Sequence, residues 1–201
     1  MVLAYKLMNL VPPLGRVYLS RLQKLNISVQ LYALTRDGES RTGLPQASST
    51  NADGGRAWLL SVEHLKGLRE GLRTHAGVAP LNVAGISTAD GIHSTLSTGG
   101  NTPVPAGLTV DVLPKVRAGW VRLLVAAHYS EATGSPSSGQ APLRTSLDVA
   151  CLARVPNGGG LVLASAVPNS PTGTNLWLVV SVLEVDAKGN PIKPPARTPL
   201  Q

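Results

Sequence analysis

The chain has 201 residues, of which 43% are hydrophobic and only 14% are charged. This length gives one large domain or two small ones with a buried core, and the composition excludes an intrinsically disordered chain. The core must be aliphatic, because phenylalanine is absent and aromatic residues make up 3%. The net charge is +7, but the lysines and arginines are dispersed, without the basic run or aromatic-rich strands typical of nucleic-acid-binding proteins.

Neither a spanning helix nor a leader is evident. No apolar run reaches the length of a membrane-spanning helix, and residues 1–8 lack the charged, apolar and small-residue pattern of a secretory signal. We therefore expect a cytoplasmic chain, or one whose signal or N-terminal part has been removed. The single cysteine, Cys151, excludes an internal disulfide and a cysteine-based metal site.

The first predicted strand covers residues 26–35. Four apolar side chains occupy every second position there: Ile27, Val29, Leu31 and Ala33. The segment Arg36-Asp37-Gly38 predicts a turn that ends this strand. Residues 37–56 are rich in small polar side chains and predict a long polar loop.

The hydrophobic period then changes to that of a helix. Apolar residues recur at three- and four-residue steps with charged residues between them: Trp58, Leu59, Val62, Leu65, Leu68 and Leu72. This spacing predicts one amphipathic helix, which Gly77 closes.

Strands fill the rest of the chain. Residues 81–98 predict a β-hairpin, because Asp90-Gly91 supplies the positive φ angles that tight hairpin turns need. Five further strands are expected at residues 106–116, 121–129, 143–155, 161–167 and 176–185. The last of these is apolar on both faces, so we expect it to lie centrally between two layers.

The expected fold class is therefore mainly β with one principal α-helix. Antiparallel strands and hairpins would form a sheet or sandwich, or one protomer's share of an oligomeric β-barrel.

Four segments resemble, in order and in motif, the C-terminal domain of the bacterial secretins of type II and III secretion and type IV pili. They are the helix at 65–72, the turn at 86–91, the strand Gly107-Leu108-Thr109-Val110-Asp111-Val112-Leu113-Pro114, and the strand at 176–182 with its Asp186-Ala187-Lys188-Gly189-Asn190-Pro191 turn. The similarity covers about residues 58–193. It is to a divergent branch in which the last strand ends in an Asp-x-x-Gly-Asn turn.

This resemblance implies three parts and a set of structural positions. The parts are 1–57, an N-terminal strand and polar loop that would act as an interacting segment; 58–193, the secretin-like β domain; and 194–201, an extended tail. The positions expected to matter for assembly or structure are Gly107, Leu108, Thr109, Asp111, Pro114, Asp90, Gly91, Trp177, Val180 and Gly189.

The resemblance also implies a function. It predicts a structural envelope protein that assembles into a homo-oligomer, whose protomers share a barrel wall as an outer-membrane ring or channel for secretion or pilus passage. The implied partners are further copies of the chain, other envelope or secretion-machine components, and the membrane through the oligomeric barrel. The implied location is the outer membrane or periplasm.

Residues for catalysis or metal binding do not gather in the sequence. The four histidines show no metal-ligand spacing: His64, His75, His93 and His128. Asp90 fits a turn and Asp148 an outward strand charge better than the two fit an acid/base pair. The glycines at 158–160 are not followed by a predicted helix that could hold phosphate.

We therefore expect no enzyme, no cofactor and no metal. Two alternatives stay open besides the envelope protein. A virion or tail-type building block would show the same aliphatic strands and long polar loops. A ligand-binding β-sandwich is disfavoured by the shortage of aromatic residues.

Overall fold

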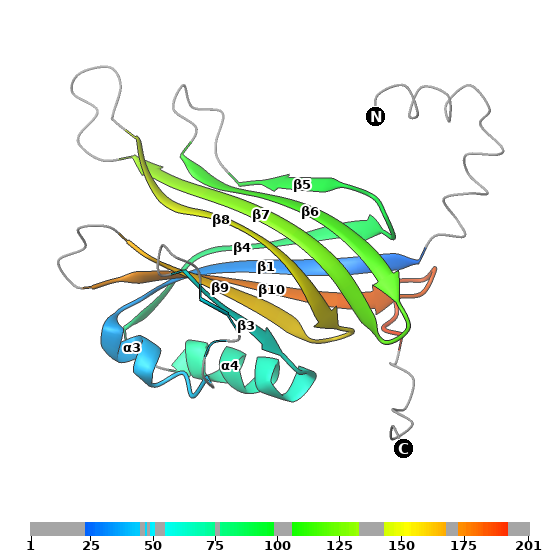
Figure 1. The fold of residues 1–201 in the computed structure, drawn as a ribbon, viewed down its shortest axis with the longest axis horizontal. Coiled ribbons are helices and arrows are strands. Elements are labelled where there is room, and N and C mark those ends of the chain that lie inside the picture. The colour runs from blue at the N-terminus through cyan, green and yellow to red at the C-terminus, as the bar shows by residue number, and fades with distance from the viewer. Residues whose placement is uncertain are drawn as a thin grey trace.

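A computed structural model describes residues 23–44, 47, 49–50, 55–74, 77–98, 106–132, 143–167 and 173–192. In these ranges the chain forms ten strands in two antiparallel sheets, and two helices. The two sheets pack face to face, and both helices lie beyond the larger sheet, on its side away from the smaller one (Figure 1). The fold expected from the sequence, mainly β with one principal helix, is confirmed.

The larger sheet has six strands in the order β2-β3-β9-β10-β1-β4. Their bounds are β1 Lys24–Leu34, β2 Ser49–Thr50, β3 Arg56–Leu60, β4 Val78–Ala89, β9 Gly160–Ala166 and β10 Asn175–Val185. At its centre β1 pairs antiparallel with β10, from Lys24 opposite Val185 to Leu34 opposite Asn175. The first described strand is thus joined to the last described strand.

The smaller sheet has four strands in the order β5-β6-β7-β8. Their bounds are β5 Ser94–Ser97, β6 Gly107–Arg117, β7 Trp120–Ala132 and β8 Leu143–Pro156. The predicted alternation holds in β6: Leu108, Val110, Val112 and Val116 are buried, whereas Thr109, Asp111 and Lys115 lie on the other face.

The main core lies between the two sheets and is aliphatic. Its largest members include Leu25, Ile27, Leu31, Leu108, Leu123, Leu147 and Leu178, all less than 2% exposed. A strand with an apolar row on one face buries that row only against another layer. The alternating apolar positions of β1, β6, β7 and β10 therefore account for the face-to-face packing.

A second core lies between the six-stranded sheet and helix α4, Val62–Thr74. The helix turns its three buried leucines toward the sheet: Leu65, Leu68 and Leu72. Trp58 of β3 and Trp177 of β10 meet them, and the two indole rings lie 5.2 Å apart at a tilt of 31°. Strand β10 is thus buried on both faces in the middle of its sheet, which confirms the expected central position.

The predicted hairpin at residues 81–98 is wrong. The turn exists, and Gly91 has a φ of 70°, but β4 pairs with β1 in one sheet while β5 pairs with β6 in the other. The Asp90-Gly91 turn carries the chain across the sandwich instead of folding two strands onto each other. An Asp-Gly pair fixes the backbone of a turn, but partners far away in sequence decide which strands pair.

The predicted helix begins too early. Trp58 and Leu59 belong to strand β3, where Trp58 is buried and Leu59 is exposed. Ser61 starts the helix: its hydroxyl accepts the backbone N–H of His64 at 3.3 Å, as an N-cap serine does. Trp58 fits both a helical and an alternating pattern, and in the structure its side chain packs in the second core, between the six-stranded sheet and α4.

The predicted turn at Arg36-Asp37-Gly38 and the long loop after it are also wrong in part. Residues Arg36–Ser40 form a short helix, α3, capped by Thr35, whose hydroxyl accepts the N–H of Gly38 at 3.2 Å. Glu39 of this helix bonds to Arg56 of β3 and to Asn175 of β10. The helix is therefore fixed to the sheet by its own carboxylate.

Strand β1 belongs to residues 1–57, which the sequence assigns to a separate N-terminal segment. It pairs on both sides with strands of the 58–193 segment, so this part of the chain completes the same sandwich. Residues 1–22 and the tail at 194–201 lie outside the described residues. Neither described helix has the length and apolar character to cross a membrane.

Candidate assembly surface

A long unpaired backbone edge of the four-stranded sheet belongs to β8. One side of β8 pairs with β7 along its whole length, and within the described ranges no strand pairs with its other side. No proline interrupts the strand before Pro156. A long edge strand of this kind presents a row of free N–H and C=O groups on which another strand can form.

The opposite edge of the four-stranded sheet is largely closed. The segment before β5 lies beside β6 and bonds to two of its outer backbone groups. Asp90 accepts the N–H of Val116 at 2.7 Å, and the N–H of Gly91 donates to the carbonyl of Pro114 at 2.8 Å. Three predicted positions, Asp90, Gly91 and Pro114, are thus brought together here, and only the short strand β5 leaves an outward edge on this side.

Side chains link the two sheets beside this closed edge. Asn82 of β4 donates to the hydroxyl of Thr98, and Ser94 of β5 donates to the hydroxyl of Thr88 at 2.7 Å. These bonds join strands that share no backbone pairing. The β4 side of the sandwich is therefore held to β5 by side chains, whereas on the β8 side the described hydrogen bonds to the other sheet lie at the end of the strand, where Gly158 donates to the carbonyl of Val182.

The other predicted positions are scattered through the molecule. Leu108 and Val180 are fully buried in the main core, and Trp177 is buried in the second core. Gly107 opens β6 with a φ of 141°. Thr109 lies on the outer face of β6, with its hydroxyl 3.5 Å from that of Ser97 of β5. Most of these positions stabilise the fold and do not form part of an exposed surface.

Two predicted positions carry exposed polar contacts. Asp111 accepts a hydrogen bond from Thr95 of β5, and His93 lies 3.2 Å from the same carboxylate. Gly189 has a φ of 87° in the turn after β10. There the carboxylate of Asp186 accepts the backbone N–H and the side-chain amide of Asn190, which lower the pKa of Asp186. This turn follows Val185, which lies opposite Lys24 of β1, as does Ala89 before the Asp90-Gly91 turn.

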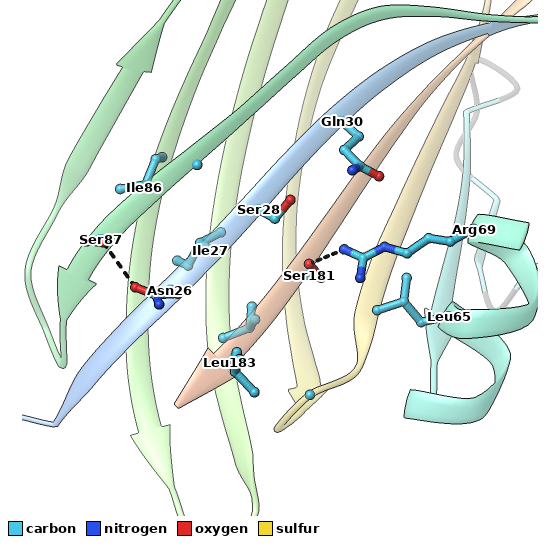
Figure 2. A pocket seen from close by; sticks show the side chains of 13 residues that line it. Asn26, Ile27, Ser28, Gln30, Leu65, Arg69, Ile86, Ser87, Ser181 and Leu183 are labelled. Atoms are coloured by element: carbon cyan, nitrogen blue, oxygen red, sulfur yellow. Dashed lines mark hydrogen bonds between the residues drawn. The ribbon is translucent and has the colours of Figure 1, made fainter. Parts of the chain in front are cut away.

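A polar groove that the sequence did not predict lies on the outer face of the six-stranded sheet, beside α4 (Figure 2). Its volume is about 710 Å³, and it is lined by Asn26, Ser28 and Gln30 of β1 together with Ser181 of β10. Arg69 of α4 reaches across to donate to Ser181 at 2.8 Å. Ser181 interrupts the apolar row Trp177–Val179–Leu183, a signal that could have pointed to this groove.

Groups suited to metal or thiol chemistry are sparse in the described ranges. No group of three or more His, Cys, Asp or Glu side chains gathers there. Cys151 is half-buried between the sheets, and burial raises the pKa of its thiol, which keeps it protonated and unreactive at neutral pH.

No protein-family model and no curated protein matches the chain. Several solved structures are similar to it. Aeromonas hydrophila ExeD matches with a TM-score of 0.44 and 14% identity, over 92% of this chain and 52% of that one. The type II secretion system secretin XcpQ from Pseudomonas aeruginosa matches with 0.43 and 15%, over 90% and 64%.

The type II secretion system secretin GspD of E. coli K12 matches with a TM-score of 0.41 and 14% identity, over 94% of this chain and 55% of that one. The chain therefore spans between about half and two thirds of the length of these three proteins. The latter two proteins, XcpQ and GspD, are described as secretins.

Proposed function

We propose that the protein is a structural, self-assembling subunit of the bacterial cell envelope rather than an enzyme. Its copies would join through the four-stranded sheet. The observation that carries this proposal is the unpaired edge of β8 in a sheet whose other edge is shielded by the Asp90–Gly91 turn. Natural proteins cover or interrupt such edges unless another chain pairs with them.

The asymmetry of the two edges favours a head-to-tail contact. The edge of β8 in one copy would meet the outward edge of β5 in the next, so that the sheet continues from copy to copy. A contact between two different surfaces closes into a ring when the rotation per copy allows it. In this proposal Asp90, Gly91 and Pro114 leave β5 as the one receiving edge.

The resemblance of residues 58–193 to the secretin domain supports the envelope setting. It also supports the finer proposals of an outer-membrane ring, of passage for a secreted protein or pilus, and of secretion-machine components as further partners. The open edge of β8 supports self-assembly without the resemblance.

Cross-linking tests the contact. In a Cys151→Ala background, Ser97→Cys places a thiol on β5 and Ala150→Cys places one on β8, at exposed positions on the same face of the sheet. With a bis-maleimide reagent, the head-to-tail contact predicts a ladder of trimers and larger species from the double variant. Each single variant should then give little product.

Two results would count against this arrangement. Strong dimers from Ala150→Cys alone would indicate that two β8 edges pair with each other, which replaces the ring by a two-fold dimer. Light scattering that shows only a 20.9 kDa monomer at micromolar concentration, with no cross-linked product, would overturn self-assembly itself.

A further inference from the structure

One face of the four-stranded sheet is turned away from the six-stranded sheet (Figure 1). Two rows of side chains cross this outer face. The leucine row consists of Leu113 on β6, Leu124 on β7 and Leu152 on β8, which are direct cross-strand partners. They are 38%, 43% and 55% exposed. No described element packs over them, so the row faces outward.

The neighbouring row is positively charged. This cationic row consists of Lys115, Arg122 and Arg154, paired across the same three strands and all exposed. It lies two residues further toward the β6–β7 turn than the leucine row. Adjacent strands are only about 4.8 Å apart, and like charges directly opposite each other destabilise a sheet.

Nothing described within the protein neutralises the cationic row. None of its three members forms an ion pair in the described ranges. Asp111 lies on the same face of β6 but contacts His93 and Thr95, and Asp90 accepts the backbone N–H of Val116. Repulsion within the cationic row therefore destabilises the fold, and no described contact inside the protein offsets it. This points to a negatively charged partner.

A tryptophan lies on the same outer face, next to the cationic row. Trp120 begins β7, and the guanidinium carbon of Arg154 lies 5.2 Å from its ring centroid. Tryptophan and arginine next to exposed leucines are the composition of surfaces that contact a membrane interface. Cations that flank an apolar patch bind anionic headgroups while the patch enters the acyl boundary.

We propose that this outer face binds the surface of a membrane that contains anionic phospholipids. The leucine row and the adjacent Ala126 and Ala150, whose row ends in Asp111 on β6, form an apolar band only two rows deep, and each row spans about 7 Å along the strands. That depth is well short of the band of about 25 Å on a spanning strand, so the contact lies on the membrane surface. Nucleic acid would satisfy the cations but leave the leucine row in water.

Vesicle binding by the full chain tests the proposal. Flotation should recover the protein with vesicles of phosphatidylcholine mixed with phosphatidylglycerol, and not with phosphatidylcholine alone. Because each cation near an anionic surface contributes about fivefold, Lys115→Thr, Arg122→Thr and Arg154→Thr combined should weaken binding on the order of 100-fold. Leu124→Ser with Leu152→Ser should weaken it while the net charge stays the same.

A matched variant controls for charge alone. Lys66→Ser, Arg73→Ser and Lys188→Ser remove three exposed cations elsewhere and should leave vesicle binding nearly unchanged. Equal loss in the two triple variants would overturn the proposal, and so would failure of the wild-type chain to bind the phosphatidylglycerol vesicles. Tighter binding to a DNA duplex than to vesicles, at matched phosphate concentration and salt, would assign the face to nucleic acid instead.

Discussion

The side-chain oxygen of Asn157 accepts the backbone N–H of Glu184 at 2.9 Å, although the first residue follows β8 and the second belongs to β10 in the other sheet. Both residues are buried. The amide group of Asn157 also donates to the carbonyl of Ile192 at 3.2 Å. One buried side chain thus ties together the ends of strands from both sheets.

Replacing Asn157 with alanine should lower the free energy of unfolding by about 1–3 kcal/mol, because it leaves the buried N–H of Glu184 without a partner. Urea unfolding followed by circular dichroism measures this. Asn26→Ala is the control: it removes an exposed bond from Ser87 and should change stability by no more than about 0.5 kcal/mol. Equal losses of unfolding free energy in both variants would contradict a larger contribution from the buried bond between the sheets.

Glu184 should make stability fall as the pH rises. Burial raises the pKa of its carboxyl group above the ordinary glutamate value of 4.5, and one carboxylate oxygen has no described hydrogen-bond partner. The folded state holds its proton to higher pH than the unfolded state does. The stabilisation is thus complete below about pH 4.5 and is lost as the pH rises through the folded pKa.

Glu184→Gln removes this titration while it keeps the shape of the side chain. Thermal melts from acid to neutral pH should show a higher Tm at neutral pH than in the parent, together with a shallower dependence on pH. A parent and variant that change in parallel across the whole range would contradict the role of Glu184.

Trp177 contributes to the second core through its ring and not through its N–H. Its indole nitrogen is buried without a described partner, whereas its ring packs against Trp58. Trp177→Ala should cost about 3–5 kcal/mol. Trp177→Phe keeps a ring, removes the unpaired N–H and leaves a smaller cavity, so it should cost clearly less than Trp177→Ala, and comparison of the two unfolding free energies checks this.

Val180 tests the central position of β10. Its side chain is fully buried between the sheets, so Val180→Lys would place an unpaired charge there at a cost of at least about 3 kcal/mol. We expect loss of the folded state or of assembly. Asp148→Lys, on the exposed face of β8, should stay within about 0.5 kcal/mol of the parent. Thermal melts and size-exclusion runs of both variants beside the parent test this expectation. A Val180→Lys protein that folds and assembles normally would refute the buried position.

The sequence predicts the faces of strands better than their partners. Alternation identifies the buried side of β6 because it reflects a local geometry with a period of two residues. The continuous apolar run of β10 indicates a central strand for the same reason. By contrast, the Asp90-Gly91 turn looks the same in sequence whether the flanking strands pair with each other or join different sheets.

The same difference between strand faces and strand partners applies to the candidate surfaces. Lys115 is visible in the sequence as an outward residue of its strand, but its alignment with Arg122 and Arg154 exists only through the registers of two separate strand pairs. The open edge of β8 likewise depends on which strands end up beside it. Both features arise from long-range pairing, which local patterns do not encode.

The pairing of β1 with β10 limits the order in which the sheet can form. The middle of the six-stranded sheet joins the first described strand to the last one, so it cannot be completed until the chain has been synthesised through residue 185. Contacts so distant in sequence make folding slow. Until β10 arrives, the apolar residues of β1 lack their partner and are exposed to aggregation. Chains cut short before residue 175 should therefore be recovered as insoluble material or be removed by proteases.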